Sequence, residues 1–238
     1  MAFNDLDLSE RLDLARRGTA YFAQRLADLP DGGLSGPSLL DGWTRAHLVA
    51  HVGYNAAALC RLLDWAATGV ETPMYESAEQ RAQEIAEGAT LSPAAIRNLF
   101  EHTVARLDGS WRSLPDAAWN AEVRTAQGRT VPVSETAWIR SREVWIHAVD
   151  LGNGGRFGDF PTVVLESLLA EIVGMWRRKG EGGGLVLQVD GAASVAVDET
   201  AETRRVSGSL AGVVRWAAGR GAVGVTVAGA DEGPPRWL

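Results

Sequence analysis

Hydrophobic residues recur with the 3.6-residue period of an α-helix from residue 8 to residue 179, and capping residues interrupt this pattern. Ser77 with Gln80 and Ser92 with Pro93 are typical helix starts, and Gly69 is typical of a left-handed helix end. Further N-caps are predicted at Ser9, Thr44 and Ser134. The predicted helices cover residues 9–29, 45–68, a short segment after 77, 93–114, 134–151 and 162–179.

The period changes after the glycine-rich turn at residues 180–184. Alternating or continuous runs of β-branched and apolar residues predict short strands at residues 185–189, 194–197 and 223–227. A helix is predicted between them at residues 209–218. We therefore expect an α+β protein with a helical bundle over residues 1–180 and a small C-terminal α/β domain over residues 181–238.

Residues 115–132 contain turn-forming residues and little periodicity. We expect a long loop here, with a hairpin around Gln127 and Gly128. Long loops inside compact domains are often functional, so this segment is a candidate lid.

The composition and the net charge argue against nucleic-acid and membrane partners. The chain has 238 residues, of which 46% are hydrophobic and 22% charged, and a formal net charge of -7 with scattered Lys and Arg. A nucleic-acid partner is not expected, because binders of nucleic acid carry basic patches. No apolar run reaches the length of roughly 18 residues that a membrane span needs, and the acidic N-terminus does not resemble a signal peptide. We expect a cytoplasmic protein without a membrane partner, in which the single cysteine, Cys60, is a core residue.

Two residue pairs carry the candidate chemistry. His47 and His51 lie near the start of one predicted helix, and Glu143 and His147 have the same spacing in another. Residues four apart on an α-helix lie on one face with Cβ atoms roughly 6 Å apart, close enough to share a cation. Two such helices side by side would form a metal site.

Glu143 favours a metal over two ordinary core histidines. It lies in an apolar segment, where an unpaired carboxylate is costly to bury and a cation would neutralise it. Two histidines and one carboxylate with an open position form a ligand set of catalytic zinc, and they also suit iron, nickel or cobalt. From spacing alone, His47 and His51 both remain candidate ligands. One of them can be a supporting residue that lies next to the ligands without binding the metal.

Asp150 is a candidate supporting residue. It follows His147 by three positions, so it lies on the same side of the helix and could orient the imidazole, as metal-bound histidines usually require. A solvated charge at a helix end explains Asp150 equally well.

Two motifs in the chain resemble those of the mycothiol-dependent maleylpyruvate isomerases: residues 41–51 (DGWTRAHLVAH) and residues 142–151 (REVWIHAVDL). The resemblance covers almost the whole chain. It implies a DinB-like, four-helix-type metal-binding bundle followed by a small α/β domain. It also implies that His51, Glu143 and His147 bind zinc, and thereby selects His51 over His47.

The resemblance implies a reaction. Zinc would hold the sulfur of mycothiol, a low-molecular-weight thiol, as a thiolate. The thiolate would add to the cis double bond of maleylpyruvate, a dicarboxylic keto acid, and leave after rotation to give fumarylpyruvate, as in gentisate-type aromatic degradation. Arg220, in a stretch resembling the one that supplies an arginine in the family, is the candidate catalytic cation. Arg81 is a second, substrate-binding candidate, and each arginine is also explained as an ordinary charge on a helix.

Two alternatives remain open. Similar bundles serve as mycothiol S-transferases, which attach the thiol to an electrophile without releasing it. A metal-stabilised binding protein without turnover is the other alternative, and a fourth protein ligand such as His47 or Asp150 would favour it.

Overall fold

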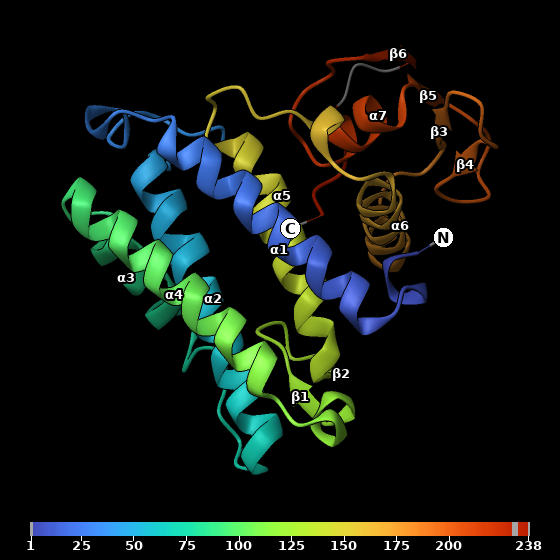
Figure 1. Ribbon diagram of the computed structural model, residues 1–238. Coiled ribbons are helices and arrows are strands. Elements are labelled where there is room, and N and C mark those ends of the chain that lie inside the picture. The colour runs from blue at the N-terminus through green and yellow to red at the C-terminus, as the bar shows by residue number, and fades with distance from the viewer. Residues whose placement is uncertain (1, 230–232, 238) are drawn as a thin grey trace. The chain divides into compact units, whose positions relative to one another are not determined.

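The computed structural model describes residues 2–229 and 233–237 (Figure 1). Contacts within the chain divide it into two compact units: residues 7–155 form one, and residues 2–6 with the described part of 156–238 form the other. This division differs from the predicted boundary at residue 180. The helix that precedes residue 180 packs against a helix of the C-terminal unit, and a change of hydrophobic period does not reveal which partner a helix packs against.

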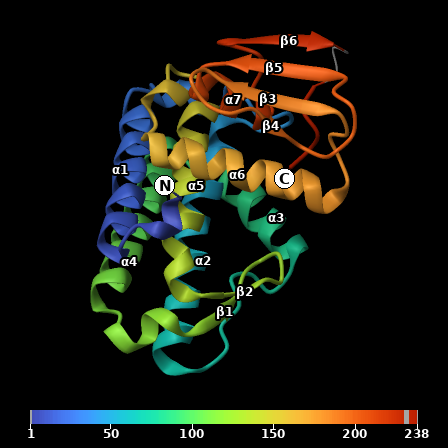
Figure 2. The same cartoon turned by 90° about the vertical axis from the view of Figure 1, so that its right-hand side faces the viewer.

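The first unit contains the predicted bundle without its last helix, the one predicted at residues 162–179 (Figures 1 and 2). Within it, α2 packs against α4, α5 and α3, while α1 packs against α5. The helices of this unit are α1 (Leu8–Ala27), α2 (Arg45–Thr68), α3 (Ala78–Gly88), α4 (Pro93–Ser113) and α5 (Thr136–Asp150). Short 3-10 helices lie at Asp31–Gly33, Asp116–Asn120 and Val133–Glu135. The α+β class with a four-helix-type bundle is confirmed.

A glycine sets the close approach of α1 to α5. A Cβ atom on Gly18 would lie 2.6 Å from Nε1 of Trp145 and 2.7 Å from Cγ2 of Val144, so only glycine fits here. The same indole donates a hydrogen bond to the carbonyl oxygen of Leu14 (3.2 Å) and stacks on Tyr21. This contact fixes α5 against α1.

Most helix starts agree with the predicted caps. The hydroxyl groups of Ser77 and Ser92 accept hydrogen bonds from the backbone at the starts of α3 and α4. Two predicted caps are wrong. Asp7, and not Ser9, caps α1, because its carboxylate accepts from the backbone N–H of Glu10 while Ser9 lies inside the helix. Ser134 lies in the 3-10 helix before α5, and its side chain does not cap α5.

Thr44 begins α2, the helix that carries the histidine pair. Its Oγ1 accepts a hydrogen bond from the backbone N–H of His47 (3.3 Å), and the helix ends at Gly69 in a left-handed conformation (φ 72°). Cys60, further along the same helix, is fully buried, as predicted.

Replacing Thr44 by alanine is expected to lower the free energy of unfolding of the metal-free protein by about 1 kcal/mol, because the first turn of α2 loses its cap. Chemical denaturation followed by circular dichroism measures this change. Thr44→Ser, which keeps the hydroxyl that accepts from the backbone N–H of His47, serves as the control, with a change within about 0.5 kcal/mol. Equal losses in the two variants would contradict the capping role of Thr44.

The segment between α4 and α5 contains the predicted hairpin. The strands β1 (Glu122–Arg124) and β2 (Thr130–Pro132) pair antiparallel, with Val123 opposite Val131 and both side chains buried. Gly128 supplies the positive φ (78°) that the turn requires. The segment is therefore more ordered than the predicted loop, and its role as a lid remains a prediction.

The C-terminal unit contains a sheet of strand order β4-β3-β5-β6, in which β3 and β5 are parallel and the other pairs antiparallel (Figure 2). Its elements are a 3-10 helix at Phe3–Asp5, another at Phe157–Asp159, α6 (Thr162–Lys179), β3 (Leu185–Val189), β4 (Val195–Ala196), β5 (Arg204–Gly208), α7 (Leu210–Ala217) and β6 (Val225–Gly229). The prediction missed β5 and placed β6 two residues early. The strand β5 begins with two consecutive arginines, so its sequence lacks the apolar pattern that predicts a strand. In the structure, the guanidinium of Arg204 lies 5.5 Å from the ring centroid of Trp216.

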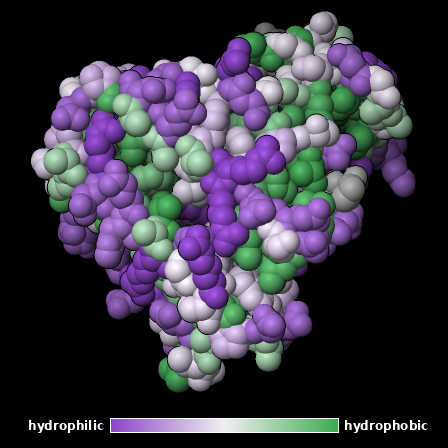
Figure 3. All heavy atoms as spheres, in the orientation of Figure 1, coloured by the Kyte–Doolittle hydropathy of each residue, from purple (hydrophilic) through white to green (hydrophobic). Residues whose placement is uncertain are grey.

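The visible surface mixes polar and hydrophobic side chains, as the composition indicates (Figure 3). Among the residues that the structure describes, no helix combines the length and apolar character needed to cross a membrane.

Candidate metal centre

Two neighbouring helices bring the predicted ligands together. His51 comes from α2, and Glu143 and His147 lie one turn apart on α5, which packs against α2. The Oε2 atom of Glu143 lies 2.8 Å from Nε2 of His51 and 3.2 Å from Nε2 of His147. One ligand atom from each of the three residues lies within 4.8 Å of the other two. The i,i+4 spacing thus places both α5 groups opposite the histidine of α2.

The three side chains are largely buried, and burial and hydrogen bonds shift their pKa values. Burial raises the pKa of the Glu143 carboxyl, but hydrogen bonds from His147 and His51 outweigh it and hold that pKa well below its usual range. Burial lowers the pKa of His51. For His147, burial acts in the same direction, but its bonds to Asp150 and Glu143 outweigh it and raise the pKa. The cluster therefore pairs an ionised carboxylate with imidazoles on both sides.

The chemistry of the donor set fits a divalent metal ion. Two imidazole nitrogens and one carboxylate oxygen point to a common centre, and a cation there would neutralise a carboxylate whose side chain is only 13% exposed. The same donors suit zinc, iron, nickel or cobalt. Metal binding would take the place of the bonds that now join the carboxylate to the imidazoles.

Asp150 contacts His147 on the side of the imidazole that faces away from Glu143. Its Oδ2 is 2.9 Å from Nδ1 of His147, and the residue is fully buried. The imidazole therefore presents Nε2 to the cluster while Nδ1–H donates to a carboxylate, an arrangement that orients metal-bound histidines in proteins.

Asp150→Asn is expected to weaken metal binding about 10- to 100-fold, because the imidazole of His147 loses a charged acceptor that fixes its orientation. Competition with a chromogenic chelator measures the affinity. The matched control is Asp108→Asn, which removes a half-buried carboxylate that pairs with Arg16 in the same unit. An unchanged affinity in Asp150→Asn would contradict a supporting role.

His47 does not join the three converging groups. Its Nδ1 lies 2.7 Å from Oγ1 of Thr44, and this pair closes the start of α2. The indole of Trp43 lies near both histidines of the first motif, with ring centroids 6.3 Å from His47 and 5.5 Å from His51. The structure thus separates the two histidines that the spacing left equivalent.

Two arginines line the cluster. Arg81 of α3 places Nη2 3.3 Å from Nδ1 of His51, and its guanidinium lies 5.6 Å from the ring centroid of Tyr75. Arg142, which sequence reasoning missed, places Nη2 3.4 Å from Oε1 of Glu143. Adjacent residues on a helix do not share a face, so their spacing gave no signal for this pair.

Arg220, the predicted catalytic cation, lies in the C-terminal unit just beyond α7. Its Nη1 donates a hydrogen bond to the carbonyl oxygen of Ala218 (2.5 Å), and its own carbonyl oxygen accepts one from Nε of Arg215 (2.8 Å). The catalytic role of Arg220 stays a prediction.

A family model and two solved structures point to the same family. The model of the mycothiol maleylpyruvate isomerase N-terminal domain matches residues 15–152. The chain is similar to the crystal structure of the mycothiol-dependent maleylpyruvate isomerase, with 55% identity, a TM-score of 0.97 and 100% of each chain covered. The crystal structure of a histidine-to-alanine mutant of that enzyme gives the same identity, TM-score and coverage. Curated protein sequences give no match.

Proposed function

Because the chain belongs to the mycothiol maleylpyruvate isomerase family, we propose that it is a mycothiol-dependent cis–trans isomerase that converts maleylpyruvate to fumarylpyruvate. The observation that carries the proposal is the convergence of His51, Glu143 and His147 within the region that the family model matches. The reaction needs only two small molecules, a dicarboxylic keto acid and a thiol. The proposal therefore keeps the expectation of a cytoplasmic protein without a nucleic-acid or membrane partner.

His51, Glu143 and His147 would hold the metal ion, with zinc as the proposed metal. When bound, the metal would lower the pKa of a coordinated thiol, so that a thiolate is available at neutral pH. Three converging groups favour a catalytic site with an open position over a structural site with four protein ligands. This reading is supported by the engagement of His47 with Thr44 and of Asp150 with Nδ1 of His147.

When bound, mycothiol would supply the thiolate that adds to the cis double bond, permits rotation about the resulting single bond and is eliminated as the trans bond forms. The protein must meanwhile hold two carboxylates and the negative charge that develops on the conjugated carbonyl oxygen. Arg81, beside His51, would bind a carboxylate near the metal ligands. Arg142, beside Glu143, would add a second positive charge next to the ligand set. Arg220 is proposed to stabilise the enolate-like charge.

The deciding experiment is a turnover assay on metal-analysed protein with maleylpyruvate, with and without mycothiol, in which NMR follows the geometry of the product. The proposal expects the trans product to form only with the thiol and to stop forming after chelation. Accumulation of a stable thioether would instead identify a mycothiol S-transferase. No reaction under any of these conditions would leave a metal-stabilised binding protein.

A further inference from the structure

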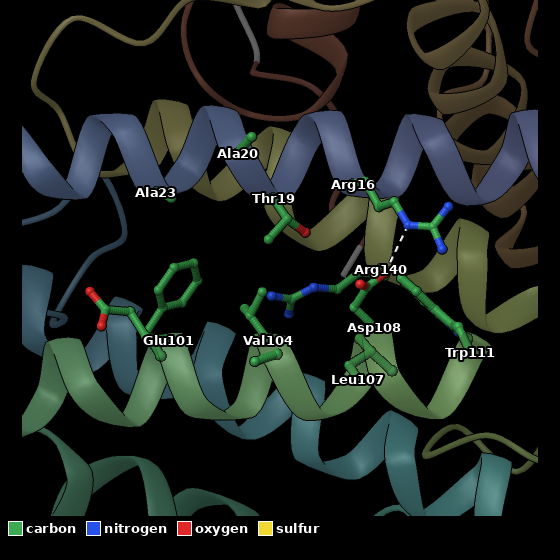
Figure 4. A pocket seen from close by; sticks show the side chains of 12 residues that line it. Arg16, Thr19, Ala20, Ala23, Glu101, Val104, Leu107, Asp108, Trp111 and Arg140 are labelled. Atoms are coloured by element: carbon green, nitrogen blue, oxygen red, sulfur yellow. Dashed lines mark hydrogen bonds and ion pairs between the residues drawn. The ribbon is translucent and has the colours of Figure 1, made fainter. Parts of the chain in front are cut away.

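A cavity that is partly open to solvent lies in the helical unit, between α1 and α4 (Figure 4). Its volume is about 410 Å³, within the range of roughly 300–1,000 Å³ that is typical of ligand pockets. Mostly apolar side chains form the walls, among them Ala20 and Ala23 of α1 and Val104 and Leu107 of α4. His51, Glu143 and His147 do not line it, so the cavity is distinct from the candidate metal centre.

Contacts between side chains hold the two helices around this space. Nε of Arg16 on α1 lies 2.8 Å from Oδ1 of Asp108 on α4, and the rings of Phe22 and Phe100 pack with centroids 5.1 Å apart. The charges of Arg16 and Asp108 thereby satisfy each other. The carboxylate of Glu101 is at an exposed position, where solvent screens it.

Arg140 of α5 brings a positive charge to this apolar space. Figure 4 shows its side chain reaching from α5 toward the gap between α1 and α4. The residue is fully buried. Its Nη1 donates to the carbonyl oxygen of Val52 (2.7 Å) and to Oδ1 of Asn55 (3.0 Å). Its Nε and Nη2 atoms are buried and have no hydrogen-bond partner among the residues that the structure describes.

This arrangement is costly without a ligand. Burial lowers the pKa of Arg140 to about 10, so the guanidinium still carries its charge at neutral pH. Buried donors without acceptors and a buried charge without an adjacent counter-charge both destabilise a fold. Glu143 attracts this charge from the next turn of α5, but its carboxylate is already bonded to two histidines. Among the residues that the structure describes, no carboxylate is therefore hydrogen-bonded to the guanidinium.

We propose that the cavity binds a small apolar molecule with a single carboxylate, such as a medium-chain fatty acid. The carboxylate accepts hydrogen bonds from Nε and Nη2 of Arg140, and the hydrocarbon chain lies between α1 and α4. Two adjacent guanidinium donors match the two oxygens of a carboxylate, which explains why this pair of donors is left open. The apolar walls favour a hydrocarbon chain over a strongly hydrated anion such as phosphate.

Isothermal titration with octanoate and with octanol tests the charge requirement on the unaltered protein. Octanoate is expected to bind at least about tenfold more tightly, because octanol fills the same volume but cannot neutralise the guanidinium. Equal affinities would overturn the role of Arg140, and no octanoate binding would overturn the site. Arg140→Gln is expected to remove the preference, and the comparison of the two ligands remains decisive if this variant does not fold.

Two further variants establish where octanoate binds. Ala23→Phe fills the cavity from α1 and is expected to abolish binding, whereas Ala94→Phe, at an exposed position of α4 outside the cavity, is the matched control. His51→Ala is expected to bind octanoate as the unaltered protein does. Undiminished binding in Ala23→Phe, or loss of binding in His51→Ala, would assign octanoate to another site and overturn the proposal.

Discussion

Glu143→Ala is expected to lose bound metal and isomerase activity together, and His51→Ala to do the same. Each variant removes one of three groups that converge on one point, and Glu143 contributes the negative charge that balances a divalent cation. Metal content should fall from about one ion per chain to near zero, and turnover should fall by a factor on the order of 10³ or more, the effect of removing a metal that activates the nucleophile.

Elemental analysis of purified protein and the NMR assay of turnover measure the two losses in parallel. Glu122→Ala, at an exposed position of β1, is the control and should keep both metal and activity. Retained zinc in His51→Ala would show that the wrong histidine was selected, and His47 would then be the next variant to make. Loss of activity without loss of metal would move Glu143 from the ligand set to another catalytic role.

Arg220→Ala is expected to keep its metal and lose turnover, by a factor on the order of 10² to 10³, as for removal of one group that stabilises developing negative charge. The residue follows α7 in the C-terminal unit, whereas all three proposed ligands belong to the helical unit. Removing it should therefore leave the metal ligands intact. The kinetic signature is a lower kcat at full metal occupancy.

The control for Arg220 is Arg178→Ala, which removes an exposed arginine from α6 of the same unit and should leave turnover unchanged. Full activity of Arg220→Ala would contradict the assigned role. If Arg81→Ala lost turnover instead, the catalytic cation would be the arginine that the structure places beside His51.

Local rules predicted most of the fold. Ser77, Ser92 and Ser209 begin helices where their side chains satisfy the first backbone N–H groups, and each needs only a few neighbouring residues to do so. The rule gave the wrong residue at the first helix because Asp7 also competes for this role. Long-range packing could not be predicted in this way, because the hydrophobic period of α6 is the same whichever unit the helix packs against.

In the candidate site, too, spacing within a helix was predictable and packing between helices was not. Spacing predicted that Glu143 and His147 share a face, but it did not decide between the two histidines of α2, because that choice depends on how α2 packs against α5. Arg140 was missed for another reason. A charged residue in a helix is ordinarily expected at the surface, and only the packed bundle shows that this one is fully buried.

The burial of Cys60 has a consequence for the redox behaviour of the protein. A working pool of a small thiol always contains some of its disulfide, which can form mixed disulfides with reactive protein thiols. Burial raises the pKa of Cys60, so its sulfur stays protonated and out of reach. Because this is the only cysteine of the chain, the protein offers no thiolate for exchange, and oxidation of the thiol pool leaves its covalent structure unchanged.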